Sequence, residues 1–227
     1  MRSIHAFLAA ILACSSCHAL SQELVAFSTV DGAQIEADLY GSGTYGVVLA
    51  HGGRFDKESW TNQARALVDA GFLVLALNFR GYGESRGPGE SDPLAAPLHL
   101  DVLGAVQYLK ERGADRIGIV GGSMGGNAAA EAAATLGPGE LRSLTLLASG
   151  AGERPDRILT PTLFIVARDD LQFDGTPRLV GIREDYEMVR VAKELVVTDG
   201  SAHAQYLFET PQGPEVMAAI VAFLSGY

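Results

Sequence analysis

A single serine stands between two pairs of glycines in the stretch "GGSMGG", residues 121–126. The apolar run "RIGIV" precedes these glycines and an alanine-rich stretch follows them, which predicts a turn between a strand and a helix. Glycine is needed where such a turn is strained and neighbouring backbones approach closely. Residues 121–125 fit the pattern G-x-S-x-G, in which the serine is raised on the turn as a nucleophile. Ser123 is therefore the candidate nucleophile.

A phosphate-binding loop is the competing interpretation of the same glycines. A loop of the Walker type ends in lysine followed by serine or threonine, whereas Asn127 follows Gly126 here. The glycines also miss the G-x-G-x-x-G register of dinucleotide-binding loops. The sequence therefore favours nucleophilic chemistry over phosphate binding.

A serine hydroxyl becomes nucleophilic when a base removes its proton and a carboxylate orients that base. Three histidines follow residue 19. His99 falls inside a predicted helix, and His51 directly follows the first predicted parallel strand. His203 lies in a turn after the last predicted strand, where it can reach the nucleophile, so it is the candidate base. Asp169 and Asp170 follow the strand "FIVA" and are both candidate acids.

The elements that must position these residues alternate between strands and helices. Asp31-Gly32 marks a hairpin within 24–40, because Asp-Gly favours a tight turn between strands. This alternation predicts an α/β fold with a mostly parallel twisted sheet of about eight strands. The helices of its right-handed crossover connections are expected to cover both faces of the sheet. Ligands bind such a sheet at the carboxyl ends of its strands, where the candidate residues stand. Further strands are predicted at 46–50, 72–78, 116–120, 143–149, 161–167 and 193–199, and helices at 59–71, 97–113, 124–136, 181–192 and 213–227.

Further short motifs accompany the serine turn: "HGG" at 51–53, "FRGYGES" at 79–85 and G-x-x-H at 200–203. Together with an acid after the penultimate strand, they make the chain resemble the α/β-hydrolase superfamily over nearly all of the sequence beyond residue 19. The small dienelactone-hydrolase-like members look most similar, although they commonly have cysteine where Ser123 stands. The resemblance implies a serine hydrolase that acts through a Ser-His-Asp triad and an acyl-enzyme intermediate.

The resemblance also selects among the candidate acids. In the superfamily the acid usually ends a G-x-x-D turn, with which "ARDD" aligns, and this alignment selects Asp170. A shift of one residue would select Asp169 instead. Asp199 lies near the candidate base, but "TDGS" is typical of a turn. The implied catalytic set is therefore Ser123, Asp170 and His203.

The oxyanion of an acyl-transfer intermediate needs two fixed donors, which are commonly backbone amides. We expect these donors to be the N–H of Met124, directly after the nucleophile, and the N–H of Gly53. Arg54 stands where an HGGG-type esterase has its third glycine, so resemblance to that group does not extend to this loop. Arg80 and Ser85 are expected to fix their own loop by hydrogen bonds rather than to catalyse.

Ten residues, 150–159, separate two predicted strands at the place where many superfamily members insert a helical lid. A segment of this length makes a loop and about one turn of helix, so we expect no cap domain and an open site. Arg54, Phe55 and Trp60 are expected at its rim. An open site favours small or short-chain esters or lactones, which places the expected activity in the carboxylesterase class, EC 3.1.1.

The composition bounds the partners. With 227 residues, 48% of them hydrophobic and 19% charged, the chain is typical of a globular protein. The net charge of −10 argues against nucleic acid and anionic membranes as partners. The partner that the resemblance implies is a small-molecule ester. The histidines are scattered without ligand spacing, so we expect no metal and no cofactor. An aminopeptidase-like serine hydrolase and a hydrolase-like binding or receptor module are the alternatives.

The N-terminal segment has the features of a secretory signal peptide. Arg2 precedes the apolar stretch 6–13, and small residues follow as far as Ala19. We expect 1–19 to be removed, leaving a single domain at 20–227 in a secreted or periplasmic protein. Both cysteines, at positions 14 and 17, would leave with the signal. A lipoprotein signal that lipidates Cys14 is the alternative.

Overall fold

The computed structural model describes residues 22–93 and 95–227, so the expected signal peptide and Cys14 lie outside the described residues. Eight strands form one sheet in the order β1-β2-β4-β3-β5-β6-β7-β8. The strands from β4 to β8 pair in parallel, whereas β1 pairs with β2, and β2 with β4, in antiparallel fashion. The predicted fold class is confirmed. The strands are β1 (Gln22–Ser28), β2 (Gln34–Tyr40), β3 (Tyr45–Ala50), β4 (Leu73–Leu77), β5 (Arg116–Gly122), β6 (Ser143–Leu147), β7 (Thr162–Ala167) and β8 (Lys193–Thr198).

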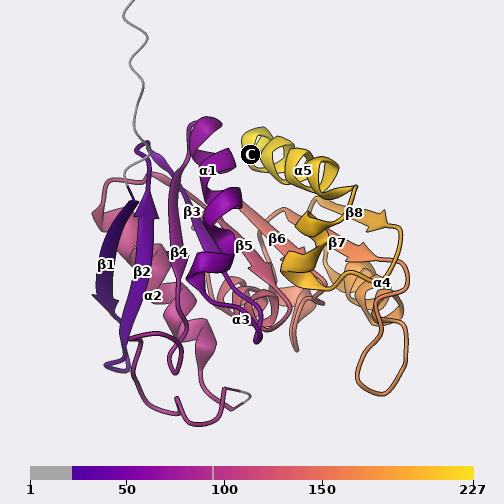
Figure 1. Cartoon of the computed structure of the whole chain (residues 1–227), viewed down its shortest axis with the longest axis horizontal. Coiled ribbons are helices and arrows are strands. Elements are labelled where there is room, and N and C mark those ends of the chain that lie inside the picture. The colour runs from indigo at the N-terminus through magenta and orange to yellow at the C-terminus, as the bar shows by residue number, and fades with distance from the viewer. Residues whose placement is uncertain (1–21, 94) are drawn as a thin grey trace, which may run out of the picture.

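Helices cover both faces of the sheet (Figure 1). One apolar core lies between the sheet and α2, α3 and α4, and a second lies between the sheet and α1 and α5. In β3, Val48 and Ala50 enter the first core and Val47 and Leu49 enter the second, because successive side chains of a strand point to opposite faces. The continuous apolar strands of the sequence follow from this double burial. The helices are α1 (Thr61–Asp69), α2 (Leu98–Glu111), α3 (Met124–Ala133), α4 (Arg178–Met188) and α5 (Gly213–Gly226), with 3-10 turns η1 (Lys57–Trp60), η2 (Pro155–Arg157) and η3 (Ala204–Glu209).

The boundaries of α4 differ from the sequence prediction. The helix begins at Arg178 rather than at residue 181 and ends at Met188 rather than at residue 192. Pro177 precedes it in an extended conformation, so the chain turns into the helix directly after the proline. Because α4 buries only Leu179 and Ile182, its apolar pattern was a weak guide to its start.

The segment between β6 and β7 carries a single short 3-10 turn, η2, among residues 150–159. No cap domain is inserted there, as predicted. The carboxyl ends of the parallel strands are therefore flanked by loops. Two of the loop segments, residues 86–93 with 95–97 and residues 171–177, project from that edge of the sheet (Figure 1).

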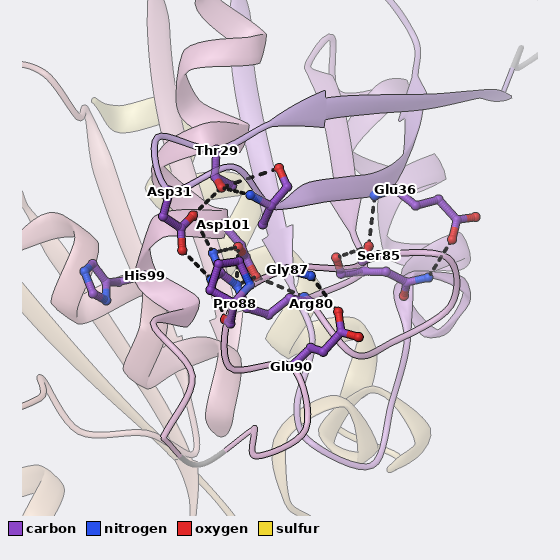
Figure 2. Close-up of polar contacts among 12 residues, drawn as sticks. Thr29, Asp31, Glu36, Arg80, Ser85, Gly87, Pro88, Glu90, His99 and Asp101 are labelled. Carbon is purple, nitrogen blue, oxygen red and sulfur yellow. Dashed lines mark hydrogen bonds and ion pairs between the residues drawn. The ribbon is translucent and has the colours of Figure 1, made fainter.

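A buried ionic cluster fixes the loop that follows β4 (Figure 2). Arg80 is fully buried and donates from Nη2 and Nε to Asp101 of α2 at 2.6 and 2.9 Å. It also donates to Asp31 in the β1–β2 turn, at 3.1 Å, and to the carbonyl of Pro88 at 2.9 Å. The hydrogen bond from Arg80 lowers the pKa of Asp31 to about 2, whereas burial raises the pKa of Asp101. Arg80 therefore fixes its own loop, as expected, and also joins that loop to the hairpin and to α2.

Ser85 completes this anchoring. Its hydroxyl donates to the carbonyl of Asn78 at 2.8 Å and accepts the N–H of Glu36 at 2.9 Å (Figure 2). The loop is thereby held at both ends of its first turn, which confirms the role expected for Ser85. Its continuation, through Pro93 and Ala96, reaches the cleft described below.

Replacing Arg80 with methionine should destabilise the protein by about 3–5 kcal/mol at pH 7, because Asp101 would be left buried without its counter-charge. Urea unfolding of Arg80→Met, wild type and Arg65→Met measures this. Arg65 is exposed on α1, and its loss should change the free energy of unfolding by at most about 0.5 kcal/mol. The cost of Arg80→Met should shrink toward pH 5, where Asp101 can take up a proton. Equal stability of the two variants would contradict this account.

Candidate active site

Ser123 occupies the turn between the end of β5 at Gly122 and the start of α3 at Met124. Its φ of 51° and ψ of −115° are strained for a residue with a side chain. The N–H of Ser123 donates to the carbonyl of Leu147 in β6 at 2.8 Å, so the neighbouring strand holds the turn in place. The sequence predicted such a turn, and the structure places Ser123 on it.

The glycines around Ser123 are required by close packing. A Cβ on Gly121 would lie 2.4 Å from the carbonyl oxygen of Gly125, and one on Gly125 would lie 2.3 Å from that of Ala50. A Cβ on Gly126 would lie 2.5 Å from the Cβ of Ser149. Each distance is shorter than two atoms in contact allow, so any larger residue would push α3 away from the sheet.

His203 and Asp170 complete a hydrogen-bonded chain with Ser123. His203 Nε2 lies 2.8 Å from Ser123 Oγ, and His203 Nδ1 lies 2.8 Å from Asp170 Oδ2. A neutral ring that donates from Nδ1 to the carboxylate leaves Nε2 free to accept the serine hydrogen. Asp170 follows β7 and its side chain is 4% exposed, whereas His203 precedes η3 and its side chain is 32% exposed.

The other candidate residues are not part of the hydrogen-bonded set formed by Ser123, His203 and Asp170. Asp169 is exposed, and its backbone N–H donates to the carbonyl of Gly200. Asp199 is exposed and pairs with Arg168 at 3.7 Å. His99 lies on α2, with its Nδ1 3.5 Å from Glu131. The structure therefore brings Asp170, and none of these residues, to His203.

The backbones of Gly53 and Met124, the two residues expected to supply the oxyanion donors, lie next to each other. A Cβ built on Gly53 would lie 4.0 Å from that of Met124, so the two backbones are adjacent. Within the described residues, the N–H of neither Gly53 nor Met124 donates to another group. The Met124 N–H also belongs to the first turn of α3, where the helix favours negative charge. Tyr82 Oη donates to the Gly53 carbonyl at 3.0 Å and thereby supports the loop.

His51 lies beneath this loop, fully buried. Its Nδ1 is 2.9 Å from the Gly52 carbonyl, and its Nε2 accepts the N–H of Phe79 at 3.2 Å. Burial lowers the pKa of His51 to about 4, so the ring is neutral at pH 7. His51 therefore joins the loops that follow β3 and β4 and is not a second base.

Gln205 and Arg178 are site residues that sequence reasoning did not identify. Gln205 Oε1 accepts the N–H of Gly52 at 3.3 Å, and its Nε2 donates to Ser59 Oγ at 3.2 Å. Arg178 Nε donates to Asp170 Oδ2 at 3.1 Å. The position of Gln205 two residues after His203 was the available signal for it, and no motif marked Arg178.

A cleft of about 480 Å³ opens over Ser123 and His203. One wall comes from the loop at 86–97 and the start of α2, and the opposite wall from the loop at 171–177, where the ring of Phe173 is fully exposed. The predicted rim was wrong: Trp60 is buried in the core, Phe55 packs edge-on against Tyr206, and neither they nor Arg54 line the cleft. The lining residues are Pro93, Ala96, Leu98, Ser123, Met124, Asn127, Ala128, Glu131, Gln172, Phe173, Asp174, Arg178 and His203.

Residues 22–93 and 95–227 show neither a metal-binding cluster nor a membrane-spanning helix. No group of three or more histidine, cysteine, aspartate or glutamate side chains there could hold a metal ion. Over the same residues, every helix is too short or too polar to cross a membrane.

Residues 46–185 match the family model described as alpha/beta hydrolase fold. The esterase Pf2001 from Pyrococcus furiosus has a similar structure, with a TM-score of 0.76 and 19% identity over 92% of this chain and 93% of that chain. The dienelactone hydrolase from Anabaena variabilis has a TM-score of 0.73 and 23% identity over 92% of this chain and 99% of that chain. At these identities the likeness is one of fold.

Sequence relatives match over parts of their length. A non-heme chloroperoxidase from Streptomyces lividans is 27% identical over 171 residues, which cover 74% of this chain and 51% of the relative. The chain spans about half or less of the length of seven known relatives that it matches, from 13% to 51%.

Acidification should destabilise the protein through His51. Its pKa is about 4 in the folded protein and about 6.5 in an unfolded chain, so the unfolded chain binds more protons between these pH values. Stability from this group is complete above pH 6.5, and about 3 kcal/mol is lost as the pH falls to 4. The contribution of His51 is measured by comparing the free energy of urea unfolding of wild type and His51→Gln between pH 7 and pH 4. Glutamine can form both hydrogen bonds without titrating, so the stability difference should narrow in acid; parallel curves would refute this role.

Proposed function

Because the chain belongs to the alpha/beta hydrolase fold family, we propose that it is a serine hydrolase of carboxylic esters. The observation that carries the proposal is the hydrogen-bonded chain from Ser123 Oγ through His203 to Asp170, with both distances at 2.8 Å. A base within 2.6–3.2 Å of a serine hydroxyl, itself oriented by a carboxylate, is the arrangement that activates serine. The esterase and dienelactone hydrolase among its structural neighbours agree with this reaction class.

In the proposed reaction, Ser123 Oγ attacks the ester carbonyl carbon while His203 Nε2 takes its proton. The Asp170 carboxylate stabilises the imidazolium that forms. The carbonyl oxygen becomes an oxyanion, which accepts hydrogen bonds from the N–H groups of Gly53 and Met124. His203 then gives the proton to the departing alkoxide, so the alcohol leaves and the acyl group remains on Ser123. Water repeats these steps with His203 as base and releases the carboxylic acid.

The dimensions of the cleft support small esters or lactones as substrates. The segment 150–159 adds one 3-10 turn and no lid, and the walls come from two loops and the start of α2. A cleft of about 480 Å³ open to solvent can enclose a short acyl group and its alcohol. A longer chain would extend into water.

Replacing Ser123 with alanine should lower kcat on p-nitrophenyl acetate by at least about 10³-fold, because the acyl-enzyme can no longer form. The fold should persist, as judged by circular dichroism and thermal unfolding. Ser201→Ala is the matched control, because Ser201 is exposed in the turn before His203 and should leave turnover unchanged. Comparable turnover by Ser123→Ala and wild type would reject the proposal.

Activity should be highest on acetyl to butyryl esters. Each methylene that leaves water contributes through its buried area, at about 25 cal/mol per Å², and methylenes beyond the cleft remain hydrated. A series of p-nitrophenyl esters from acetate to palmitate measures kcat/KM against acyl length, and an emulsified triglyceride tests activation at an interface. Values of kcat/KM that rise steadily to long chains, or a jump in activity at the oil surface, would show that a longer apolar site exists.

A further inference from the structure

One oxygen of the Asp170 carboxylate accepts hydrogen bonds from two side chains. Asp170 Oδ2 accepts from His203 Nδ1 at 2.8 Å and from Arg178 Nε at 3.1 Å. The backbone N–H of Arg178 donates to the Asp170 carbonyl at 2.9 Å, and Leu171 pairs with Pro177 in an antiparallel bridge. The loop 171–177 is thus closed at its base and returns Arg178, the first residue of α4, to the carboxylate.

The guanidinium of Arg178 is held in one orientation. Nε faces Asp170, while Nη2 lies 3.4 Å from the carbonyl of Leu171. The side chain of Asp170 is 4% exposed, whereas that of Arg178 is 23% exposed and lines the cleft, so the carboxylate end of this pair is shielded from water. Arginine keeps its charge at every accessible pH, which makes it a constant positive charge beside the carboxylate.

We propose that Arg178 is a positioning residue that fixes the Asp170 carboxylate and lowers the pH at which His203 becomes a neutral base. This inference rests on the proposed serine hydrolase activity. The carboxylate attracts the positive imidazolium and would keep His203 protonated to higher pH. Arg178 offsets part of that attraction, because its own charge lies against the same oxygen. The base is therefore available in more acidic solution than Asp170 alone would allow.

The other charged groups around His203 lie in more exposed positions. Glu131 of α3 and Asp174 of the loop at 171–177 line the cleft, and Asp174 is bound to Thr176. Asp169 is exposed, and Asp199 is exposed and pairs with Arg168. Exposed charges act weakly because water and salt screen them. Within the described residues, Asp170 forms ion pairs with two basic side chains, those of Arg178 and His203.

Three variants separate charge from geometry. Arg178→Gln removes the charge and retains a side-chain amide, whereas Arg178→Lys retains the charge without the planar fork. Arg183→Gln removes the same charge from an exposed position on the same helix, away from Asp170. For each protein, kcat/KM on p-nitrophenyl acetate is measured from pH 4.5 to 9. The His203 ring is also titrated by NMR without substrate, with its signal assigned from His203→Gln.

In Arg178→Gln, the acid limb of the kcat/KM profile and the titration midpoint of the His203 ring should both move up by about 0.5–1 pH unit. Both should move by less than about 0.3 pH unit in Arg178→Lys and Arg183→Gln. Unchanged midpoints in Arg178→Gln would overturn the proposal, as would an equal shift in Arg178→Lys or Arg183→Gln. If the wild type hydrolyses no ester, the proposed function fails, and the ring titration still decides the role of Arg178.

Discussion

The tight packing of backbone around Ser123 is the constraint on which the rest of the site depends. Gly121, Gly125 and Gly126 let the start of α3 approach β5 and the loop after β3 more closely than any side chain would permit. The strained backbone of Ser123 persists because β5 lies in the middle of the sheet, between β3 and β6, and cannot relax without disrupting both neighbours. The same approach sets the N–H of Met124 next to the loop that carries Gly53. One turn therefore positions both the serine hydroxyl and one proposed oxyanion donor, the Met124 N–H, and packs against the loop that carries the other.

The remaining groups reach this turn from separate strand ends, so their alignment depends on how each loop is anchored. His51 joins the loops after β3 and β4 through two hydrogen bonds that suit a neutral ring. Arg80 anchors the next segment through the buried carboxylate of Asp101 and the partly exposed carboxylate of Asp31, and that segment leads to one wall of the cleft. On the other side, Arg178 ties the base of the loop at 171–177 to Asp170. Hydrogen bonds of neutral groups therefore hold the loops beside the expected oxyanion site, and ion pairs hold the two loops that form the walls of the cleft.

The sheet and the serine turn could be predicted from the sequence because their signals are local. Apolar runs of strand length, Asp31-Gly32 and the glycines around Ser123 each specify their own backbone, and the structure has the strands and the turn in the expected places. The role of Arg178 could not be predicted, because it depends on a loop that returns to Asp170, and the contact of Gln205 with Gly52 was signalled only by the place of Gln205 two residues after His203. The prediction that Trp60 lies at the rim was wrong for a related reason. An aromatic residue near a loop can lie at a rim or in a core, and the sequence does not show how it packs.

Covalent labelling by a fluorophosphonate tests the central claim most directly, because this probe reacts with a serine whose hydroxyl is activated by a base and whose oxyanion donors are in place. The protein is incubated with the probe at pH 7.5, and intact mass followed by peptide mapping locates the adduct. The account predicts one adduct per chain, on Ser123 in the peptide that spans the turn, and its absence when His203 is replaced by glutamine. No adduct on the native protein, or an adduct on a different residue, would contradict it.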